Sequence, residues 1–192
     1  MAPAGLILCG GRSRRMGTEK ALLEFAGERL IDRVHARLAE IAQPIFFAPG
    51  TVGRLGPLPG PEVSDTISNV GPLSGIAAGL AASPHELLCV VGVDMPWCNP
   101  ALFELAADKW SGHDAVVPRD DNGAQVLHAI YARSALPQIE RALAEQRRSV
   151  LALLDDLDVL YLDEESWRPL DAGGRFALNI NAPGDLARFS SG

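Results

Sequence analysis

The chain has few of the features that mark secreted, zinc-binding or membrane proteins. Its three cysteines, Cys9, Cys89 and Cys98, are odd in number and lack the spacing of a disulfide framework or a zinc site. The four histidines are scattered and form no metal or triad pattern. No apolar run approaches the roughly 18 residues of a membrane span. Gly10 and the arginines after it interrupt the first apolar run too early for a signal-peptide core. We therefore expect a cytoplasmic protein that contacts no membrane.

An excess of positive charge is also missing. The net charge is −7 at pH 7, from 17 Lys and Arg against 24 Asp and Glu, which argues against general nucleic-acid affinity. Positive charge is concentrated locally instead, at Arg12, Arg14, Arg15 and Lys20, and again at Arg147 and Arg148. This distribution suits a small anionic ligand better than a polymer. A length of 192 residues predicts a single domain over 1–192.

Strand-like and helix-like segments alternate along the chain. Residues 87–93 are apolar on both faces, as in a central parallel strand. The other predicted strands are 5–9, 45–47, 115–117, 127–131, 158–162 and 176–180, and the predicted helices are 30–42, 74–82, 99–110, 134–146, 149–156 and 183–189. This alternation predicts an α/β sandwich with a mostly parallel central sheet. Ligands of such folds bind at the carboxyl ends of the strands.

Residues 6–20 contain the most informative pattern. A short apolar run ends at Gly10 and Gly11, and three arginines, Gly17 and Lys20 follow. Glycines bring bare backbone N–H groups close to a ligand, and crowded cations repel one another unless an anion lies among them. The pattern therefore indicates a polyphosphate site. It matches neither the P-loop nor the dinucleotide fingerprint, and a glycine-rich junction that binds nothing is the alternative.

Asp94 follows the predicted central strand directly, in the sequence Asp94-Met95-Pro96. A carboxylate at the carboxyl end of a strand can hold Mg²⁺, which prefers oxygen ligands and substrate phosphates. The alternative is that Asp94 caps the next helix or turns the chain. The basic glycine loop at the same sheet edge favours the metal.

Two further segments contain candidate binding residues. Asp65 precedes Gly71-Pro72-Leu73-Ser74-Gly75, whose backbone can present N–H and C=O groups to a base edge. An ordinary strand–loop–helix junction would look similar. Alternation places Asn179 and Asn181 on one face of a strand end, where they would contact a polar ligand or a metal. The alternative is an Asx turn and N-cap before the last helix.

Arg147 and Arg148 precede Ser149, a predicted N-cap. The start of a helix suits an anion, although a solvated surface turn would show the same residues.

Four blocks, taken in order, resemble the molybdenum cofactor guanylyltransferases. The family sequence L-A-G-G-x-S-x-R-M-G-x-D-K corresponds to Leu8-Cys9-Gly10-Gly11-Arg12-Ser13-Arg14-Arg15-Met16-Gly17-Thr18-Glu19-Lys20. The blocks G-P-L-A-G, D-x-P and N-x-N-T-P correspond to Gly71–Gly75, Asp94–Pro96 and Asn179–Pro183. The first block is shared with other nucleotidyltransferases, whereas the combination is more specific and spans essentially the whole chain.

This resemblance implies a Rossmann-like three-layer α/β/α nucleotidyltransferase fold. It implies Mg²⁺-dependent transfer of GMP from GTP to molybdenum-bound molybdopterin, with release of pyrophosphate. The implied catalytic residues are Lys20, Arg15 and Asp94, and Asp94 is the implied metal ligand. The implied nucleotide-binding residues are Leu8, Cys9, Gly10, Gly11, Lys20, Asp65, Gly71, Pro72, Leu73, Gly75 and Asp94. The implied acceptor-binding residues are Asn179, Asn181 and Arg148.

Two departures from the family pattern are mild: Cys9 replaces an alanine and Glu19 replaces an aspartate. Ala48 stands where some members have an asparagine after the second strand, which puts that nucleotide contact in doubt. None removes a phosphate or metal group. Three alternatives stay open: a cytidylyltransferase for the same pterin, a guanylyltransferase for another phosphorylated acceptor, and a non-catalytic nucleotide-binding accessory protein. Molybdoenzyme chaperones or other cofactor-biosynthesis proteins are the expected protein partners.

Overall fold

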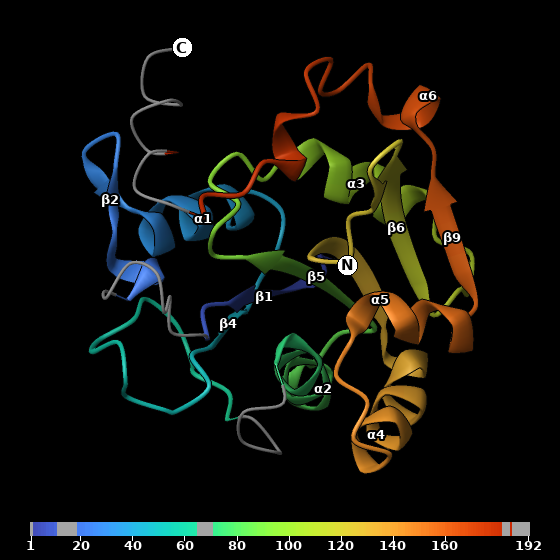
Figure 1. The fold of residues 1–192 in the computed structure, drawn as a ribbon, viewed down its shortest axis with the longest axis horizontal. Helices are drawn as coiled ribbons and strands as arrows, with labels where there is room; N and C mark the ends of the chain where they lie inside the picture. Colours follow the sequence, from blue (N-terminus) through green and yellow to red (C-terminus); the bar gives the residue numbers. More distant parts are fainter. Residues whose placement is uncertain (1, 11–18, 65–70, 182–184, 186–192) are drawn as a thin grey trace.

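A twisted mixed sheet forms the centre of the protein (Figure 1). The computed structural model describes residues 2–10, 19–64, 71–181 and 185. Within them, the order of the strands is β4-β1-β5-β8-β6-β7, and β9 pairs with β6. The strands are β1 (Ala4–Leu8), β4 (Ile45–Ala48), β5 (Leu87–Gly92), β6 (Ala115–Asp120), β7 (Gly123–Ala124), β8 (His128–Ala132) and β9 (Val159–Leu162). β1 runs parallel to β4 and β5, and β6 runs parallel to β9. The expected mostly parallel sheet is confirmed.

β8 is inserted antiparallel between β5 and β6. Only a few residues separate β6 from β8, and they include the short β7. A parallel return would need a crossover of a dozen or more residues, so this short connection allows an antiparallel pair only.

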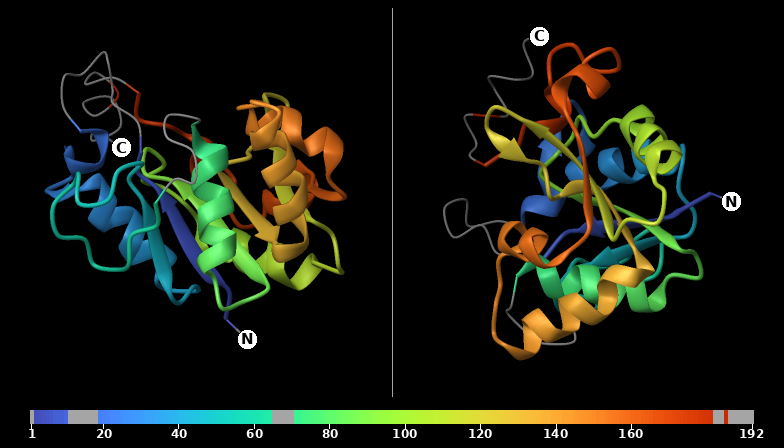
Figure 2. Two further views of the ribbon diagram at one scale, coloured as in Figure 1. Left: turned by 90° about the horizontal axis from the view of Figure 1, so that it is seen from below. Right: turned by 90° about the vertical axis from the view of Figure 1, so that its right-hand side faces the viewer.

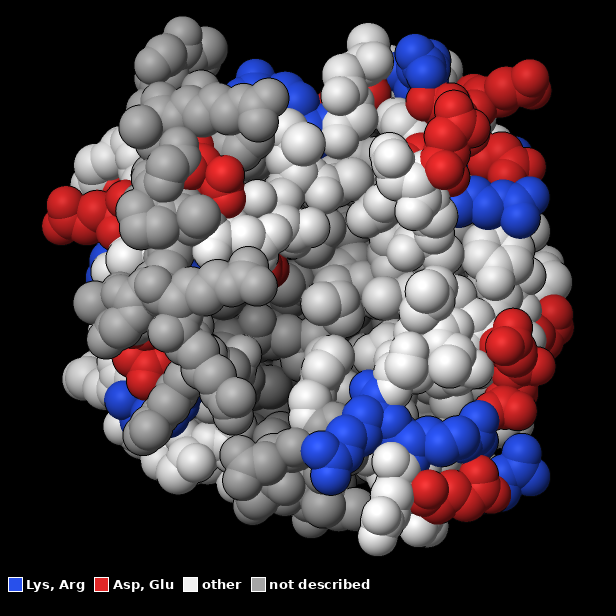
Figure 3. Space-filling model, in the orientation of Figure 1, with Lys and Arg blue, Asp and Glu red and all other residues white. Residues whose placement is uncertain are grey.

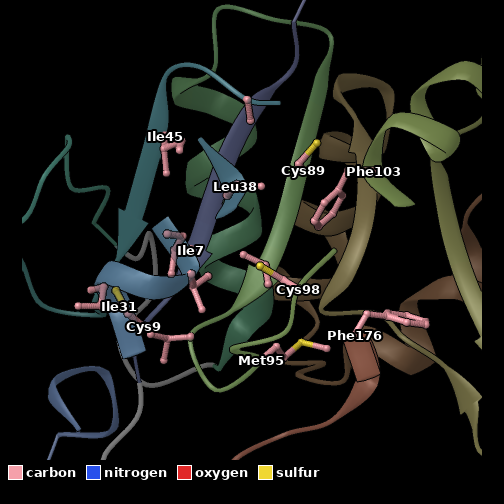
Figure 4. Close-up of a cluster of buried hydrophobic side chains, with 14 of the residues drawn as sticks. Ile7, Cys9, Ile31, Leu38, Ile45, Cys89, Met95, Cys98, Phe103 and Phe176 are labelled. Atoms are coloured by element: carbon pink, nitrogen blue, oxygen red, sulfur yellow. The ribbon is translucent and has the colours of Figure 1, made fainter. Parts of the chain in front are cut away.

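Helices cover both faces of the sheet, which confirms the three-layer prediction (Figure 2). α1 (Leu30–Leu38) and α3 (Pro100–Lys109) lie on one face, and α2 (Pro72–Ala82), α4 (Leu136–Ala144) and α5 (Val150–Leu153) lie on the other. The short α6 (Glu164–Trp167) packs against β6. Figure 4 shows part of the core on the α1 side, where Ile7, Leu38 and Phe103 pack between helix and sheet.

Local sequence signals explain why these elements form. Leu30, Val34 and Leu38 make the buried stripe of α1, as their spacing predicts. The side chain of Asn99 caps α3 by accepting a hydrogen bond from the Ala101 N–H, with Pro100 at the first helical position.

The predicted strand over 176–180 is wrong. A turn with Gly174 in the left-handed region leads into a 3₁₀ helix, Arg175–Ala177, whose N–H groups at Arg175 and Phe176 donate to the Asp171 carboxylate. Phe176 and Ile180 are both fully buried. The apolar pattern over 176–180 therefore reports buried side chains, although this segment pairs with no strand among the described residues. A short hairpin, β2 (Glu24–Phe25) with β3 (Glu28–Arg29), had no sequence prediction.

The predicted helix over 183–189 lies largely outside the described residues. In the described part of the chain, no helix has both the length and the hydropathy needed to cross a membrane.

Candidate active site

The carboxyl ends of β4, β1 and β5 meet at one edge of the sheet. Leu8, the last residue of β1, is in register with Ala48 on one side and Gly92 on the other. Two hydrogen bonds extend this pairing: the Cys9 N–H donates to the Ala48 carbonyl at 3.1 Å, and the Val93 N–H donates to the Leu8 carbonyl at 3.1 Å. The start of the glycine loop and Asp94 are therefore adjacent.

Gly10 lies close to the chain that follows β4. A Cβ at this position would lie 3.3 Å from the Ala48 carbonyl oxygen and 3.3 Å from the Pro49 carbonyl carbon, which is a tight contact. Glycine avoids this crowding between the two segments.

Cys9 is 2% exposed, and burial raises the pKa of its thiol to about 12. A protonated, buried thiol is inert, so Cys9 has only its backbone to offer a ligand.

Lys20, Asp94 and Asn181 converge from three distant parts of the chain. The Lys20 ammonium donates to Asp94 Oδ2 at 2.8 Å and to Asn181 Oδ1 at 3.0 Å. The side chains of Lys20 and Asp94 are 19% and 24% exposed, so the pair lies at the surface edge of the site. Lys20 starts a 3₁₀ helix, Lys20–Leu22, that is anchored by the buried Ala21. This cluster unites one residue from each of three sequence blocks.

The position of Asp94 is determined by its backbone neighbours. A Cβ at Gly92 would lie 2.7 Å from Asp94 Oδ1, so glycine leaves room for the carboxylate. The Asp94 carbonyl accepts a hydrogen bond from the Ile180 N–H at 2.8 Å. Asn99, and not Asp94, caps α3. The alternative role of Asp94 as a helix cap is therefore excluded.

The donor set at this edge fits a magnesium ion rather than a zinc site. Among the described residues, no three His, Cys, Asp or Glu side chains are grouped to hold a metal. Mg²⁺ is commonly held by one or two carboxylates, with waters and substrate phosphates as its other ligands. Asp94, which is ion-paired with Lys20, would supply one such carboxylate.

The start of α2 contains the predicted nucleotide-binding residues Gly71 to Gly75. Gly71 has φ +86° and ψ −163°, a conformation that is essentially restricted to glycine, and Pro72 opens the helix. Gly71 and Pro72 are exposed, whereas Leu73 and Gly75 are buried. Because the Leu73 side chain belongs to the core, its predicted nucleotide contact can involve only the backbone.

Arg148 lies on the α2 side of the site. Its carbonyl oxygen is 4.0 Å from the position of a Cβ on Gly71, and Ser149 caps α5 by accepting from the Ala152 N–H. The sequence had grouped Arg148 with Asn179 and Asn181. The structure places its backbone beside Gly71, and its contact with the acceptor stays a prediction. Figure 3 shows a hollow in this face of the molecule, with Lys and Arg side chains along its lower border.

The two asparagines differ in their contacts. Asn179 and Asn181 are both exposed and flank the buried Ile180. Exposed and buried side chains therefore alternate here as predicted, although the segment is not a strand. Only Asn181 is hydrogen-bonded to Lys20; the Asn179 amide donates to the Ala177 carbonyl at 3.3 Å. Three other predicted site residues, Gly11, Arg15 and Asp65, lie outside the described residues.

A cavity of about 490 Å³ adjoins the chain that leads to Asn181. Ala177 and Leu178 form part of its wall. The polar part of its lining is Asp120, Asn122, Gln125, Glu164 and Arg168. No sequence signal pointed to this cavity, because its walls come from the end of β6, the residues that flank β7, α6, and the segment 168–178.

Comparison with known proteins identifies the family. The family model of the MobA-like NTP transferase domain matches residues 5–159. The chain belongs to this family. The MobA-like chain is 35% identical to the probable molybdenum cofactor guanylyltransferase of Methanosarcina mazei, over 95% of this chain and 88% of that one. The corresponding protein of Pelotomaculum thermopropionicum is 36% identical, over 96% and 90% of the two chains.

Solved structures support the same assignment. Molybdopterin-guanine dinucleotide biosynthesis protein A from Archaeoglobus fulgidus superposes on the MobA-like chain with a TM-score of 0.86 at 29% identity, covering 98% and 97% of the two chains. A 2-C-methyl-D-erythritol 4-phosphate cytidylyltransferase from Thermus thermophilus shares the fold, with a TM-score of 0.72 at 14% identity. The expected nucleotidyltransferase fold and family are confirmed.

Proposed function

We propose that this MobA-like transferase transfers GMP from GTP to the terminal phosphate of molybdenum-bound molybdopterin and releases pyrophosphate. The convergence of Lys20, Asp94 and Asn181 at the carboxyl edge of the sheet supports the proposal most directly. The relatives named molybdenum cofactor guanylyltransferase, at 35% and 36% identity, support the choice of GTP and of the pterin.

The reaction needs no nucleophilic side chain. An oxygen of the acceptor phosphate attacks the α-phosphorus of GTP, and the bond from that phosphorus to the bridging β-phosphate oxygen breaks. Pyrophosphate leaves with the bonding electron pair. Because the acceptor phosphate is already an anion at neutral pH, the protein contributes positioning and charge neutralisation.

The described residues supply a cation and a metal ligand for this reaction. Lys20 donates its ammonium protons to phosphate oxygens when a triphosphate replaces Asp94 as its partner. Asp94 would hold Mg²⁺, which supplies Lewis-acid neutralisation of phosphate charge when bound. Gly10 leaves its backbone open to close approach by the nucleotide, and the N–H groups at the start of α2 favour an anion.

The acceptor is proposed to extend from Asn181 towards the cavity beside Ala177 and Leu178. The Glu164 carboxylate in its wall is ion-paired with Arg168, which also lines the cavity. The side-chain oxygens of Asp120, Asn122 and Gln125 suit the N–H donors on the edge of a pterin ring. The anionic end of the acceptor would then lie near Lys20 and its neutral ring in the cavity. The cavity volume, about 490 Å³, falls in the range of small-molecule sites.

The decisive experiment measures pyrophosphate release with each of the four nucleoside triphosphates, with and without molybdenum-bound molybdopterin. We expect release only when GTP and the pterin are both present. Release with CTP would identify a cytidylyltransferase. Turnover of GTP only with a different phosphorylated acceptor would contradict the pterin assignment. Tight GTP binding without any release would indicate an accessory protein.

The proposed setting is the cytoplasm, with molybdoenzyme chaperones or other cofactor-biosynthesis proteins as partners. The three free, buried cysteines are consistent with a reducing compartment. Cell fractionation followed by immunodetection tests the location.

A further inference from the structure

Arg54 joins three chain segments next to the candidate active site. Its guanidinium donates to the Pro49 carbonyl at 3.0 Å through Nε and to the Cys9 carbonyl at 3.1 Å through Nη2. Its Nη1 donates to the Glu19 carboxylate. Pro49 follows β4, Cys9 follows β1, and Glu19 directly precedes Lys20 in the sequence. The Arg54 side chain is 18% exposed and the Glu19 side chain 28%, so the ion pair is partly shielded from water.

The loop that carries Arg54 is itself well anchored. The Arg54 N–H closes a turn on the Thr51 carbonyl at 3.2 Å, and the next residue, Leu55, is 5% exposed. The Glu62 carboxylate accepts from the Gly53 N–H at 2.8 Å. These contacts hold the loop, and with it the Arg54 side chain, in place.

Glu19 has no other described role at this place. It occupies the N-cap position of the 3₁₀ helix at Lys20 but makes no capping hydrogen bond with its side chain. Its carboxylate is adjacent in sequence to the ammonium group that must contact phosphate. Without a partner, this carboxylate would attract the Lys20 ammonium and repel a triphosphate.

We propose that Arg54 is a positioning residue that neutralises Glu19 and so leaves the Lys20 ammonium available to Asp94 and to the phosphates of the nucleotide. The inference rests on the proposed function for the role of Lys20. The Arg54–Glu19 and Lys20–Asp94 ion pairs are neighbours along the chain, because Glu19 and Lys20 are joined by one peptide bond.

A double-mutant cycle tests the charge argument. We expect Arg54→Ala to lower kcat/KM for GTP by about 10- to 100-fold, the scale of a misplaced catalytic group. Glu19→Gln removes the competing charge and should stay close to wild type. The double variant Arg54→Ala/Glu19→Gln should recover most of the loss. Arg54→Lys keeps the charge but loses the planar fork, so its kcat/KM should lie between those of Arg54→Ala and wild type.

A purely structural role for Arg54 gives the opposite pattern. The bonds to the Pro49 and Cys9 carbonyls are lost in Arg54→Ala whether or not Glu19 is charged. A double variant as slow as Arg54→Ala, or an Arg54→Lys enzyme as slow as Arg54→Ala, would overturn the proposal. A lower KM for GTP in Glu19→Gln would show instead that Arg54 binds phosphate itself. Arg29→Ala, which removes an exposed ion pair with Asp32, is the matched control and should leave the kinetics unchanged.

A readout without substrate separates this inference from the proposed function. Lys20 and Lys109 are the two lysines of the chain, so ¹³C-dimethylation of lysine, which keeps the charge, yields two assignable side-chain signals. In the free protein, we expect the Lys20 signal to shift in Arg54→Ala and to return in the double variant, while the signal of the exposed Lys109 stays constant. A Lys20 signal unmoved by Arg54→Ala would refute the inference. Absence of GTP turnover in the wild type, with the signal changes present, would refute only the proposed function.

Discussion

Lys20 Nζ lies 2.8 Å from Asp94 Oδ2, although 74 residues separate them in the sequence. Both side chains are about one-fifth exposed, and ion pairs in contact with water contribute little to folding. The pair therefore has more significance for ligand binding than for stability. It holds a cation and the carboxylate that we propose as a metal ligand at one sheet edge, where an incoming triphosphate and its metal would replace each with a stronger partner.

Replacing Asp94 by alanine should abolish Mg²⁺-dependent pyrophosphate release. Loss of one preorganised charge contact typically raises the barrier by about 3–4 kcal/mol. The melting temperature should stay near wild type, because the ion pair is partly exposed. Release is measured across a MgCl₂ titration, with Asp32→Ala, which breaks a surface ion pair, as the control. Near-normal release from Asp94→Ala would refute the metal assignment.

Replacing Lys20 by alanine should lower the rate of the chemical step strongly while the protein stays folded. The ammonium is the described cation next to Asp94, and a neutral side chain cannot neutralise phosphate charge. Single-turnover experiments isolate the step from product release. Lys109→Ala removes an exposed lysine at the end of α3 and should match wild type. An unchanged rate in Lys20→Ala would remove Lys20 from the catalytic set.

Asn181→Ala should have a larger effect than Asn179→Ala. Asn181 Oδ1 accepts from Lys20, whereas the Asn179 amide makes one long bond within its own segment. The backbone N–H of Asn181 donates to Asp185, so truncating its side chain leaves that anchor intact. We expect about a tenfold loss in kcat/KM for the acceptor, on the order of one net hydrogen bond to a charged group. Equal effects of the two variants would contradict the placement.

Gly71→Ala should weaken both stability and nucleotide binding. The backbone at Gly71 has φ +86°, and a residue with a Cβ is strained there by about 1–3 kcal/mol. Gly112→Ala is the matched control, since Gly112 also has positive φ and has open space around it, far along the chain from the site. Both variants should have a lower melting temperature and unfold at a lower urea concentration than wild type. Only Gly71→Ala should raise the Kd for GTP. Equal Kd values would argue against a nucleotide role for this turn.

His128 should make the protein less stable in acid. Burial lowers the pKa of this imidazole to about 3, and its ring stacks on Phe103 while Nε2 accepts from the Asn99 N–H. Between about pH 3 and an unfolded value of about 6.5, the unfolded chain binds a proton that the folded chain does not. The stability from this group is therefore complete above about pH 6.5 and declines as the pH falls.

Urea unfolding at several pH values measures this contribution. Between about pH 3 and 6.5, His128 should make the free energy of unfolding change by up to about 1.4 kcal/mol per pH unit. Because carboxylates titrate over part of the same range, the diagnostic quantity is the difference between wild type and His128→Phe. The variant loses the Asn99 bond at every pH but should lack the histidine slope. Identical slopes in the two proteins would show that His128 is not responsible.

Much of the fold could be predicted because the signals are local. The unbroken apolar run of β5 and the stripe of α1 follow from periodicity, and the cap at Asn99 follows from residue type. The same reasoning failed at 176–180, where burial of Phe176 and Ile180 resembles the pattern of a strand. Periodicity records which side chains are buried and contains no information about whether a neighbouring strand is available.

The sequence by itself determined α1 to α5, most of the strands, and the residue types suited to phosphate and metal, because these depend on the spacing of residues within a few turns of helix or along one strand. It did not predict α6, and the predicted helix over 183–189 lies largely outside the described residues. Only the tertiary structure decided that Lys20 contacts both Asp94 and Asn181, that Arg54 neutralises Glu19, and that the loop of Arg148 lies beside Gly71. Those contacts join residues tens to more than a hundred positions apart. They depend on strand register and helix packing, which are properties of the whole chain rather than of any segment.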